Sequence, residues 1–236
     1  MTYLFFFAHP DDESVACAAT MHALVQNGDR VIVVLATDGA AGEMSLKAQK
    51  DLEHHKSIAN LRREEAKKAQ ETIGYHELRF LNFQDGQITN EMVWKSLKES
   101  CITMIDEYKP DVVITFDHSG WYFHLDHVGV SIATTLAVQQ ATHRTDAFLI
   151  VHMSVKQGKW KYIFPDILPI THTVNATAYK AMKLLTLDAH LSQDLEIIRK
   201  KVMEEANHLE LYQLAFATEK GKKLLHDHPV FHTVTK

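Results

Sequence analysis

Short apolar runs alternate with amphipathic segments along most of the chain, and this alternation limits the fold more than any other feature. Five runs are rich in β-branched and aromatic residues and are long enough for strands covered on both faces: 2–8, 30–37, 78–83, 111–117 and 147–153. Segments with helical patterning lie among them, at 13–27, 49–73, 90–108 and about 127–142. Strands that alternate with helices predict an α/β fold with a mostly parallel central sheet.

The pattern changes after Pro169. Residues 171–175 (THTVN) suit one further strand, and residues 176–226 are predicted to be mostly helical and to pack on the sheet edge. No linker or repeat interrupts the 236 residues, of which 46% are apolar. We therefore expect a single domain over 1–236, with a helical C-terminal part from about 175.

Charge, apolar patterning and cysteine usage exclude several classes of protein. The 25 basic and 30 acidic residues give a net charge of −5, and no basic run could neutralise a phosphate backbone, so nucleic acid is not an expected partner. The longest apolar stretch, YLFFFA, is far shorter than the roughly 20 residues of a membrane helix, so no integral membrane segment is expected. Cys17 and Cys101 form no CxxC motif, which favours a reducing, cytoplasmic location.

Polar clusters follow four of the predicted strands, at the point where each strand ends. They are AHPDDES (8–14), TDGAAGE (37–43), QDG (84–86) and DHSGWYFHLDH (117–127). Because ligands of open parallel sheets bind beyond the carboxyl ends of the strands, we expect all four clusters to meet at one crevice. The high count of 16 histidines suggests metal or proton chemistry in the chain.

The stretch HPDDE (9–13) has both a structural and a chemical interpretation. Pro10 suits the first position of a helix, and the acidic residues suit its first turn, where the helix dipole favours negative charge. This interpretation leaves His9 unexplained. His9 and Asp12 are three residues apart, so in a tight turn both side chains could bind one cation, with Asp11 beside them and free of it.

A second stretch, HLDH (124–127), repeats this spacing. Catalytic zinc commonly has three ligands from His and carboxylate groups and an open position for water. His9 and Asp12 with either His124 or His127 would make such a set. Two imidazoles and one carboxylate also accept other divalent first-row metals.

The remaining polar groups suit roles in hydrolysis. Asp11 could take the proton of water activated by the metal and pass it to the leaving group. A histidine that does not bind the metal and is held by a carboxylate could, as an imidazolium, stabilise the oxyanion of a tetrahedral intermediate, and His124 with Asp126 fits that description.

Taken together, these motifs resemble the PIG-L/LmbE family of zinc-dependent N-acetylglucosamine deacetylases. AHPDDES and HLDH carry most of the likeness, and it is supported by ATDGAAGE after the second strand, LRREEAKKAQETIG (61–74), LNFQDG (81–86) and AHLSQ (189–193). The resemblance implies a Rossmann-like three-layer α/β fold. It also implies roles for individual residues: zinc ligands His9, Asp12 and His127, general base Asp11, oxyanion stabiliser His124 tuned by Asp126, and substrate contact Arg62. Leu125 stands where the family commonly has Pro.

Several nearby residues have two interpretations each. Arg62 could contact substrate hydroxyls or form an i, i+3 pair with Glu65 on a solvated helix face. Asp38 and Glu43 could contact sugar hydroxyls or only cap and solvate their loop. Trp121 is predicted to form part of the pocket wall, because aromatic rings stack on sugar faces.

The sequence therefore predicts a metal-dependent hydrolase that removes the N-acetyl group of an N-acetylglucosamine-containing sugar or glycoconjugate. Two alternatives stay open: hydrolysis of another bond, such as a phosphoester, and a sugar- or metal-binding protein without turnover. The unliganded carboxylate of Asp11 favours the enzyme, because a pure binding site has no need of it. The acylated substrate, the native metal and any homo-oligomeric state are left open by the sequence.

Overall fold

A mixed eight-stranded sheet runs through the middle of the molecule. The computed structural model of the protein describes residues 1–45, 48, 56–152 and 169–234, and it orders the strands β3-β2-β1-β4-β5-β7-β6-β8. Neighbouring strands from β3 to β5 are parallel, whereas β7, β6 and β8 pair antiparallel. The strands are β1 (Thr2–Phe7), β2 (Arg30–Leu35), β3 (Glu77–Phe80), β4 (Val112–Phe116), β5 (Ala147–His152), β6 (His172–Asn175), β7 (Leu209–Ala217) and β8 (His232–Thr233).

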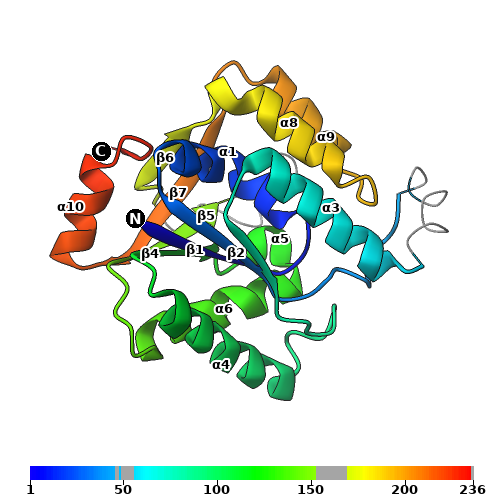
Figure 1. The fold of residues 1–236 in the computed structure, drawn as a ribbon, viewed down its shortest axis with the longest axis horizontal. Helices are drawn as coiled ribbons and strands as arrows, with labels where there is room; N and C mark the ends of the chain where they lie inside the picture. The colour runs from blue at the N-terminus through cyan, green and yellow to red at the C-terminus, as the bar shows by residue number, and fades with distance from the viewer. Residues whose placement is uncertain (46–47, 49–55, 153–168, 235–236) are drawn as a thin grey trace.

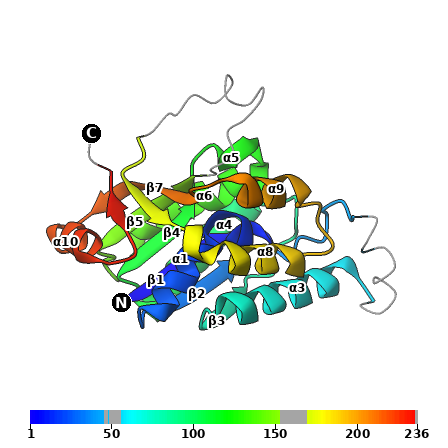
Figure 2. The same cartoon turned by 90° about the horizontal axis from the view of Figure 1, so that it is seen from above.

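Helices cover both faces of the sheet, so the predicted three-layer α/β fold is confirmed (Figures 1 and 2). One layer contains α1 (Asp12–Gln26), α3 (Ile58–Ile73), α8 (Lys180–Ala189) and α9 (Glu196–Glu204). The other contains α4 (Glu91–Tyr108), α5 (Gly120–Phe123) and α6 (Leu125–Gln140). Helix α10 (Glu219–Asp227) lies near the chain termini, and a short 3-10 helix, Thr177–Tyr179, precedes α8 (Figure 1).

Local sequence explains the strands and helices of the first two thirds. The continuous apolar runs of β1, β2, β4 and β5 are buried because helices pack on both faces of these strands. Ser57 caps α3 by accepting the backbone N–H of Asn60, and Asn90 caps α4 in the same way through Met92. Gly74 ends α3 with a left-handed backbone, φ 89°.

The C-terminal part is less helical than predicted. Helices α8 and α9 are present, but residues 209–217 form β7, which lies between β5 and β6 in the sheet. Glu210 of this strand is buried, and it forms an ion pair of 2.5 Å with Lys183, which is also buried, on α8. A carboxylate at a core position conceals the apolar alternation of a strand, which is why the sequence pattern was misread as helix.

The sheet has a topological switch point between β1 and β4. These two strands are adjacent and parallel, but the chain continues from β1 to β2 on one side and from β4 to β5 on the other. The loops that follow β1 and β4 therefore diverge, and the crevice between them is where ligands of such sheets bind. His9 follows β1, and His124 and His127 follow β4.

Candidate metal centre and active site

The turn after β1 is fixed by the side chain of Asp12. Its Oδ2 accepts the backbone N–H groups of Ala8 at 3.1 Å and His9 at 2.8 Å. Two such bonds hold the carboxylate over its own turn and direct Oδ1 to the opposite side of the crevice. There Oδ1 lies 3.2 Å from His127 Nε2. Burial opposes the charged carboxylate, but His127 and His9 outweigh it and lower the pKa of Asp12 to about 2.

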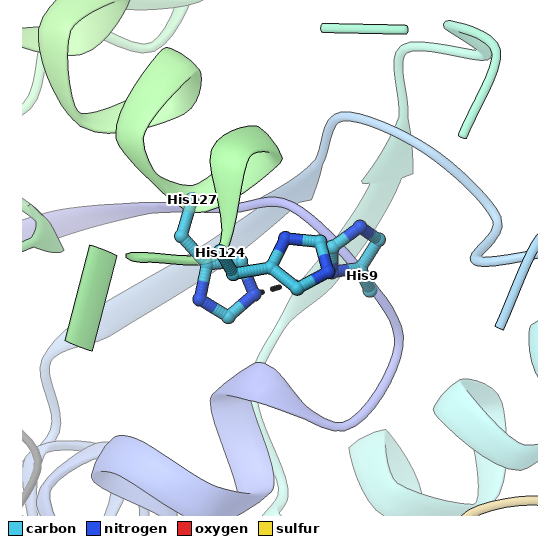
Figure 3. Close-up of side chains that lie close together, drawn as sticks. All are labelled: His9, His124 and His127. Carbon is cyan, nitrogen blue, oxygen red and sulfur yellow. Dashed lines mark hydrogen bonds between the residues drawn. The ribbon is translucent and has the colours of Figure 1, made fainter. Parts of the chain in front are cut away.

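The two imidazoles from opposite sides of the crevice face each other. His9 Nδ1 lies 3.2 Å from His127 Nε2 and 3.6 Å from Asp12 Oδ2. Figure 3 shows His9 in the loop after β1 and His127 on α6, with a dashed line for the contact between the two rings. The His127 ring stacks on Phe116 with a centroid distance of 4.2 Å, which fixes its plane. All three predicted metal ligands are therefore buried and lie next to one another.

His124 is the third imidazole of the cluster (Figure 3). Its ring centroid lies 4.8 Å from that of His9 and 4.5 Å from that of His127. One nitrogen from each of the three rings lies within 4.8 Å of the other two, so the geometry also permits His124 as a ligand. Burial, with the neighbouring His127 and His9, lowers the pKa of His124.

Asp126 and Asp85 lie next to Nε2 of His9, the ring nitrogen that does not face His127. His9 Nε2 lies 3.0 Å from Asp85 Oδ1 and 3.4 Å from Asp126 Oδ2. Asp126 also accepts the backbone N–H groups of Gly86 and Ile88, and Asp85 accepts that of Ala41. Burial opposes protonation of His9, but hydrogen bonds to Asp126 and Asp85 raise its pKa to about 10. A metal-binding histidine typically has such a carboxylate on its other nitrogen.

This arrangement differs from the sequence expectation in one respect. Asp126 was expected to tune His124, whereas the hydrogen bonds described for its carboxylate go to His9 and to the loop after β3. Its effect on His124 is that of a nearby charge, because His124 Nδ1 has no hydrogen-bond partner among the described residues.

The donor set of the crevice fits a divalent first-row metal. His9 Nδ1 and His127 Nε2 lie 3.2 Å apart, and each lies within 3.6 Å of one oxygen of the Asp12 carboxylate, Oδ2 for His9 and Oδ1 for His127. Both rings are buried. The Nε2 atom of His9 lies next to the carboxylates of Asp85 and Asp126, and metal-binding histidines typically have such a partner on their second nitrogen. Nitrogen and oxygen donors of this kind suit zinc and its first-row neighbours.

Asp11 lies beside this cluster with its backbone in an unusual conformation. Its φ is 115°, a value that costs a non-glycine residue roughly 1–3 kcal/mol and persists only where the surroundings impose it. Its carboxylate lies 3.5 Å from the guanidinium of Arg62. Burial raises the pKa of Asp11 to about 6, against the opposing charge of Arg62. A carboxylate with that pKa can exchange a proton near neutral pH.

Arg62 is buried and held by backbone carbonyls. Its guanidinium donates to Gly39 at 2.7 Å and to Pro10, in addition to its ion pair with Asp11. The alternative of a solvated pair with Glu65 is wrong, because both residues are buried and Glu65 accepts from Ser192.

A cavity of about 290 Å³ opens above these groups. This volume is near the lower limit for small-molecule sites. Its wall combines the predicted acids, imidazoles and arginine with residues from four loops: His9, Asp11, Asp12, Ala41, Gly42, Arg62, Asp85, Gly86, Tyr122, His124, His127 and Gln193.

Three residues predicted to contact substrate are not part of this wall. Trp121 is buried, donates its indole N–H to the Val151 carbonyl at 3.2 Å and packs edge-on against His127. Asp38 lies 3.3 Å from the guanidinium of Arg63. Glu43 is exposed on its loop.

Three other side chains take the wall positions that the sequence left unassigned. The ring of Tyr122, next to Trp121, lies at the cavity, and Asp85 comes from the QDG cluster that follows the third strand. Gln193 reaches the cavity from the AHLSQ stretch. The signal for Asp85 was its place after a strand end, but only the fold shows that it faces His9.

Comparisons with known proteins agree with this site. Residues 4–138, more than half of the chain, match the sequence profile of the PIG-L family, described as GlcNAc-PI de-N-acetylase. This stretch includes both His-Asp clusters, and the chain belongs to the PIG-L family.

Two curated relatives have names that specify a reaction. A mycothiol S-conjugate amidase of Streptomyces coelicolor is 32% identical over 148 residues, which cover 57% of this chain and 50% of the relative. The chain thus spans about half of that relative's length. A 1D-myo-inositol 2-acetamido-2-deoxy-alpha-D-glucopyranoside deacetylase of Mycolicibacterium vanbaalenii is 28% identical over 226 residues, with 80% of each chain covered.

Solved structures share the fold at low sequence identity. The N,N'-diacetylchitobiose deacetylase of Pyrococcus horikoshii superposes with a TM-score of 0.64 at 18% identity, covering 97% of this chain and 86% of that one. A 4-carboxy-2-hydroxymuconate hydratase of Pseudomonas putida superposes with a TM-score of 0.67 at 17% identity, covering 92% and 97%. Because a deacetylase and a hydratase share this fold, the reaction has to be argued from the site.

Proposed function

We propose that the protein hydrolyses the N-acetyl group of an N-acetylglucosamine-containing sugar or glycoconjugate, using a bound divalent metal. The observation that carries the proposal is the convergence of His9, Asp12 and His127, with the carboxylate of Asp11 beside them at the same cavity. Family membership and the names of the two relatives support an amide bond as the target.

His9, Asp12 and His127 would hold the metal, and Zn²⁺ suits this donor set. When bound, it supplies Lewis-acid activation of water and of the amide carbonyl. Because the three side chains already lie next to one another and hydrogen bonds or ring stacking hold Asp12 and His127, binding should need little rearrangement of the turns that carry them.

Asp11 is the proposed general base. Its carboxylate takes the proton of the attacking water and then returns it to the nitrogen of the departing amine. Burial against Arg62 sets its pKa at about 6, which allows both steps near neutral pH. Arg62 also fixes the direction of the carboxylate, since its own position is set by two carbonyl oxygens.

His124 is the proposed donor to the oxyanion of the tetrahedral intermediate. Its lowered pKa favours the neutral imidazole, which still has one N–H to donate. This differs from the imidazolium form expected from the sequence. Arg62, Asp85, Tyr122 and Gln193 line the rest of the cavity and offer partners for sugar hydroxyls and a ring for stacking.

A cytoplasmic location is part of the proposal. Cys17 and Cys101 are both free thiols and both buried, as suits a reducing compartment. Among the described residues, no helix has both the length and the apolar character that crossing a bilayer requires.

The experiment that tests the function is acetate release from a panel of N-acetylated amino sugars and their glycosides. The protein is stripped of metal with a chelator and reloaded with Zn²⁺, Co²⁺ or Mn²⁺. We expect acetate release only from the reloaded protein. Phosphate release from phosphoesters in the same samples would favour a phosphoester hydrolase. Sugar binding without turnover would favour a sugar-binding protein that is not an enzyme.

A further inference from the structure

The carboxylate of Glu13, directly after Asp12, is completely buried although it is not part of the cavity wall. One oxygen, Oε2, accepts the backbone N–H of Asp11 at 3.1 Å. The other, Oε1, accepts the hydroxyl of Ser14 at 3.1 Å and lies 3.3 Å from His190 Nε2. His190 is also buried, and its Nε2 lies 3.0 Å from the Ser14 hydroxyl. Burial of a carboxylate is costly unless its partners satisfy it, so this arrangement calls for a reason.

The strained backbone of Asp11 supplies that reason. A φ of 115° persists only if neighbouring groups hold the residue in place. Arg62 holds the side chain of Asp11, whereas Glu13 holds its backbone N–H. His190 in turn fixes the far oxygen of Glu13, so the orientation of Asp11 depends on a residue 176 positions beyond Ser14 in the chain.

The contacts form a closed ring. His190 follows the last turn of α8, and two residues later Ser192 donates its backbone N–H and its hydroxyl to Glu65 of α3, at 2.7 and 2.6 Å. Glu65 lies on the same helix as Arg62, which returns to Asp11. Arg62 and Glu65 of α3 and the AHLSQ stretch (189–193) are thereby joined into one support around Asp11.

We propose that Glu13 and His190 are positioning residues, which hold Asp11 in the conformation needed to act as the base. This inference rests on the proposed function, because it takes Asp11 as the base. Neither side chain lines the cavity, so neither is expected to touch substrate. Asp12 is held independently by the N–H groups of Ala8 and His9, so metal binding should survive their loss.

The test compares full-length, metal-loaded variants on the best substrate of the panel. We expect Glu13→Ala to lower kcat about 100-fold, since a displacement of about 1 Å can cost that much, while KM stays within about threefold. Glu13→Gln keeps an oxygen for the Asp11 N–H and should retain more of the rate. His190→Ala should lower kcat at least tenfold, and His190→Gln, which keeps an N–H donor, should restore part of it. Metal content should stay at one ion per chain.

A matched control separates positioning from stability. Lys183 is buried on α8, the helix that His190 follows, and is paired with Glu210, and neither side chain lines the cavity. Lys183→Met should lower the melting temperature but leave kcat per folded, metal-loaded chain unchanged. If Glu13→Ala does not fold, the two His190 variants carry the same comparison.

A double-mutant comparison distinguishes an effect through Asp11 from a general one. In an Asp11→Asn background, Glu13→Ala and His190→Ala should change the residual rate by less than about twofold. Equal losses in both backgrounds, or single variants with wild-type kcat, would overturn the positioning role and leave the proposed function intact. Absence of acetate release from the metal-loaded wild type would overturn the function and, with it, this inference.

Discussion

His9 Nδ1 and His127 Nε2 lie 3.2 Å apart, although 118 residues separate them in the chain. They meet because β1 and β4 are neighbours at the switch point of the sheet, and each histidine follows the carboxyl end of one strand. Asp12 completes the group from the first residue of α1. The fold thus brings together two imidazoles and a carboxylate, the donor set proposed to hold the metal, on neighbouring turns.

Removal of one proposed ligand should abolish metal binding. His127→Ala takes away one of two imidazoles, so we expect the metal content to fall from one ion per chain to well below half and acetate release to fall at least 100-fold. Elemental analysis after dialysis checks the first outcome. His226→Ala is the control, because this histidine is exposed on α10. A full complement of metal in the His127 variant would show that other residues hold the ion.

Metal affinity should depend steeply on pH. In the metal-free protein the pKa of His9 is raised to about 10, so at pH 7 its imidazole carries a proton that the metal must displace. The proton is favoured below the raised pKa, so affinity rises with pH, by about tenfold per unit between roughly 7 and 9. Competition with a chelator at several pH values measures this slope, and calorimetry in two buffers counts the released protons.

Asp85→Asn is the matched variant for this titration. It replaces one of the two carboxylates that raise the pKa of His9 with a neutral group of the same shape. We expect a smaller proton release and a flatter dependence of affinity on pH. An unchanged slope would mean that His9 is not the group that exchanges a proton for the metal.

Alanine at Gly39 should lower the free energy of unfolding more than alanine at Gly28, a glycine with a similar backbone conformation. Gly39 and Gly28 both have positive φ, 69° and 85°, so alanine at either costs roughly 1–2 kcal/mol of backbone strain. A Cβ at Gly28 meets no atom within 4 Å, whereas a Cβ at Gly39 would overlap the guanidinium of Arg62. Arg62 cannot easily move, because Gly39 and Pro10 carbonyls hold it.

Chemical denaturation and acetate release distinguish these two glycine variants. Gly39→Ala should lose about 3 kcal/mol or more of unfolding free energy and most of its turnover, because Arg62 would no longer hold Asp11. Gly28→Ala should lose only the roughly 1–2 kcal/mol of backbone strain from its free energy of unfolding, and it should release acetate at the wild-type rate. Equal effects of the two substitutions would show that Arg62 is free to move aside.

The sequence predicted the parts of the fold where a single physical signal dominates. Unbroken apolar runs identified β1, β2, β4 and β5, and polar residues at their ends located the crevice. The strand β7 was missed because Glu210 and Lys183 satisfy each other in the core, a pairing between distant residues that local patterning cannot reveal. Asp85 was correctly expected at the crevice but given no role, and Trp121 was wrongly expected in the pocket wall. In both cases the direction of a loop side chain depends on its three-dimensional neighbours.

The most direct test of the central claim compares acetate release and metal content of the wild type and Asp11→Asn, both loaded with the same metal. Asparagine keeps the shape of the side chain but cannot accept the proton of the attacking water. The account predicts one ion per chain in both proteins and a rate in the variant at least 100-fold below that of the wild type. A metal-loaded Asp11→Asn protein that releases acetate at the wild-type rate would contradict it.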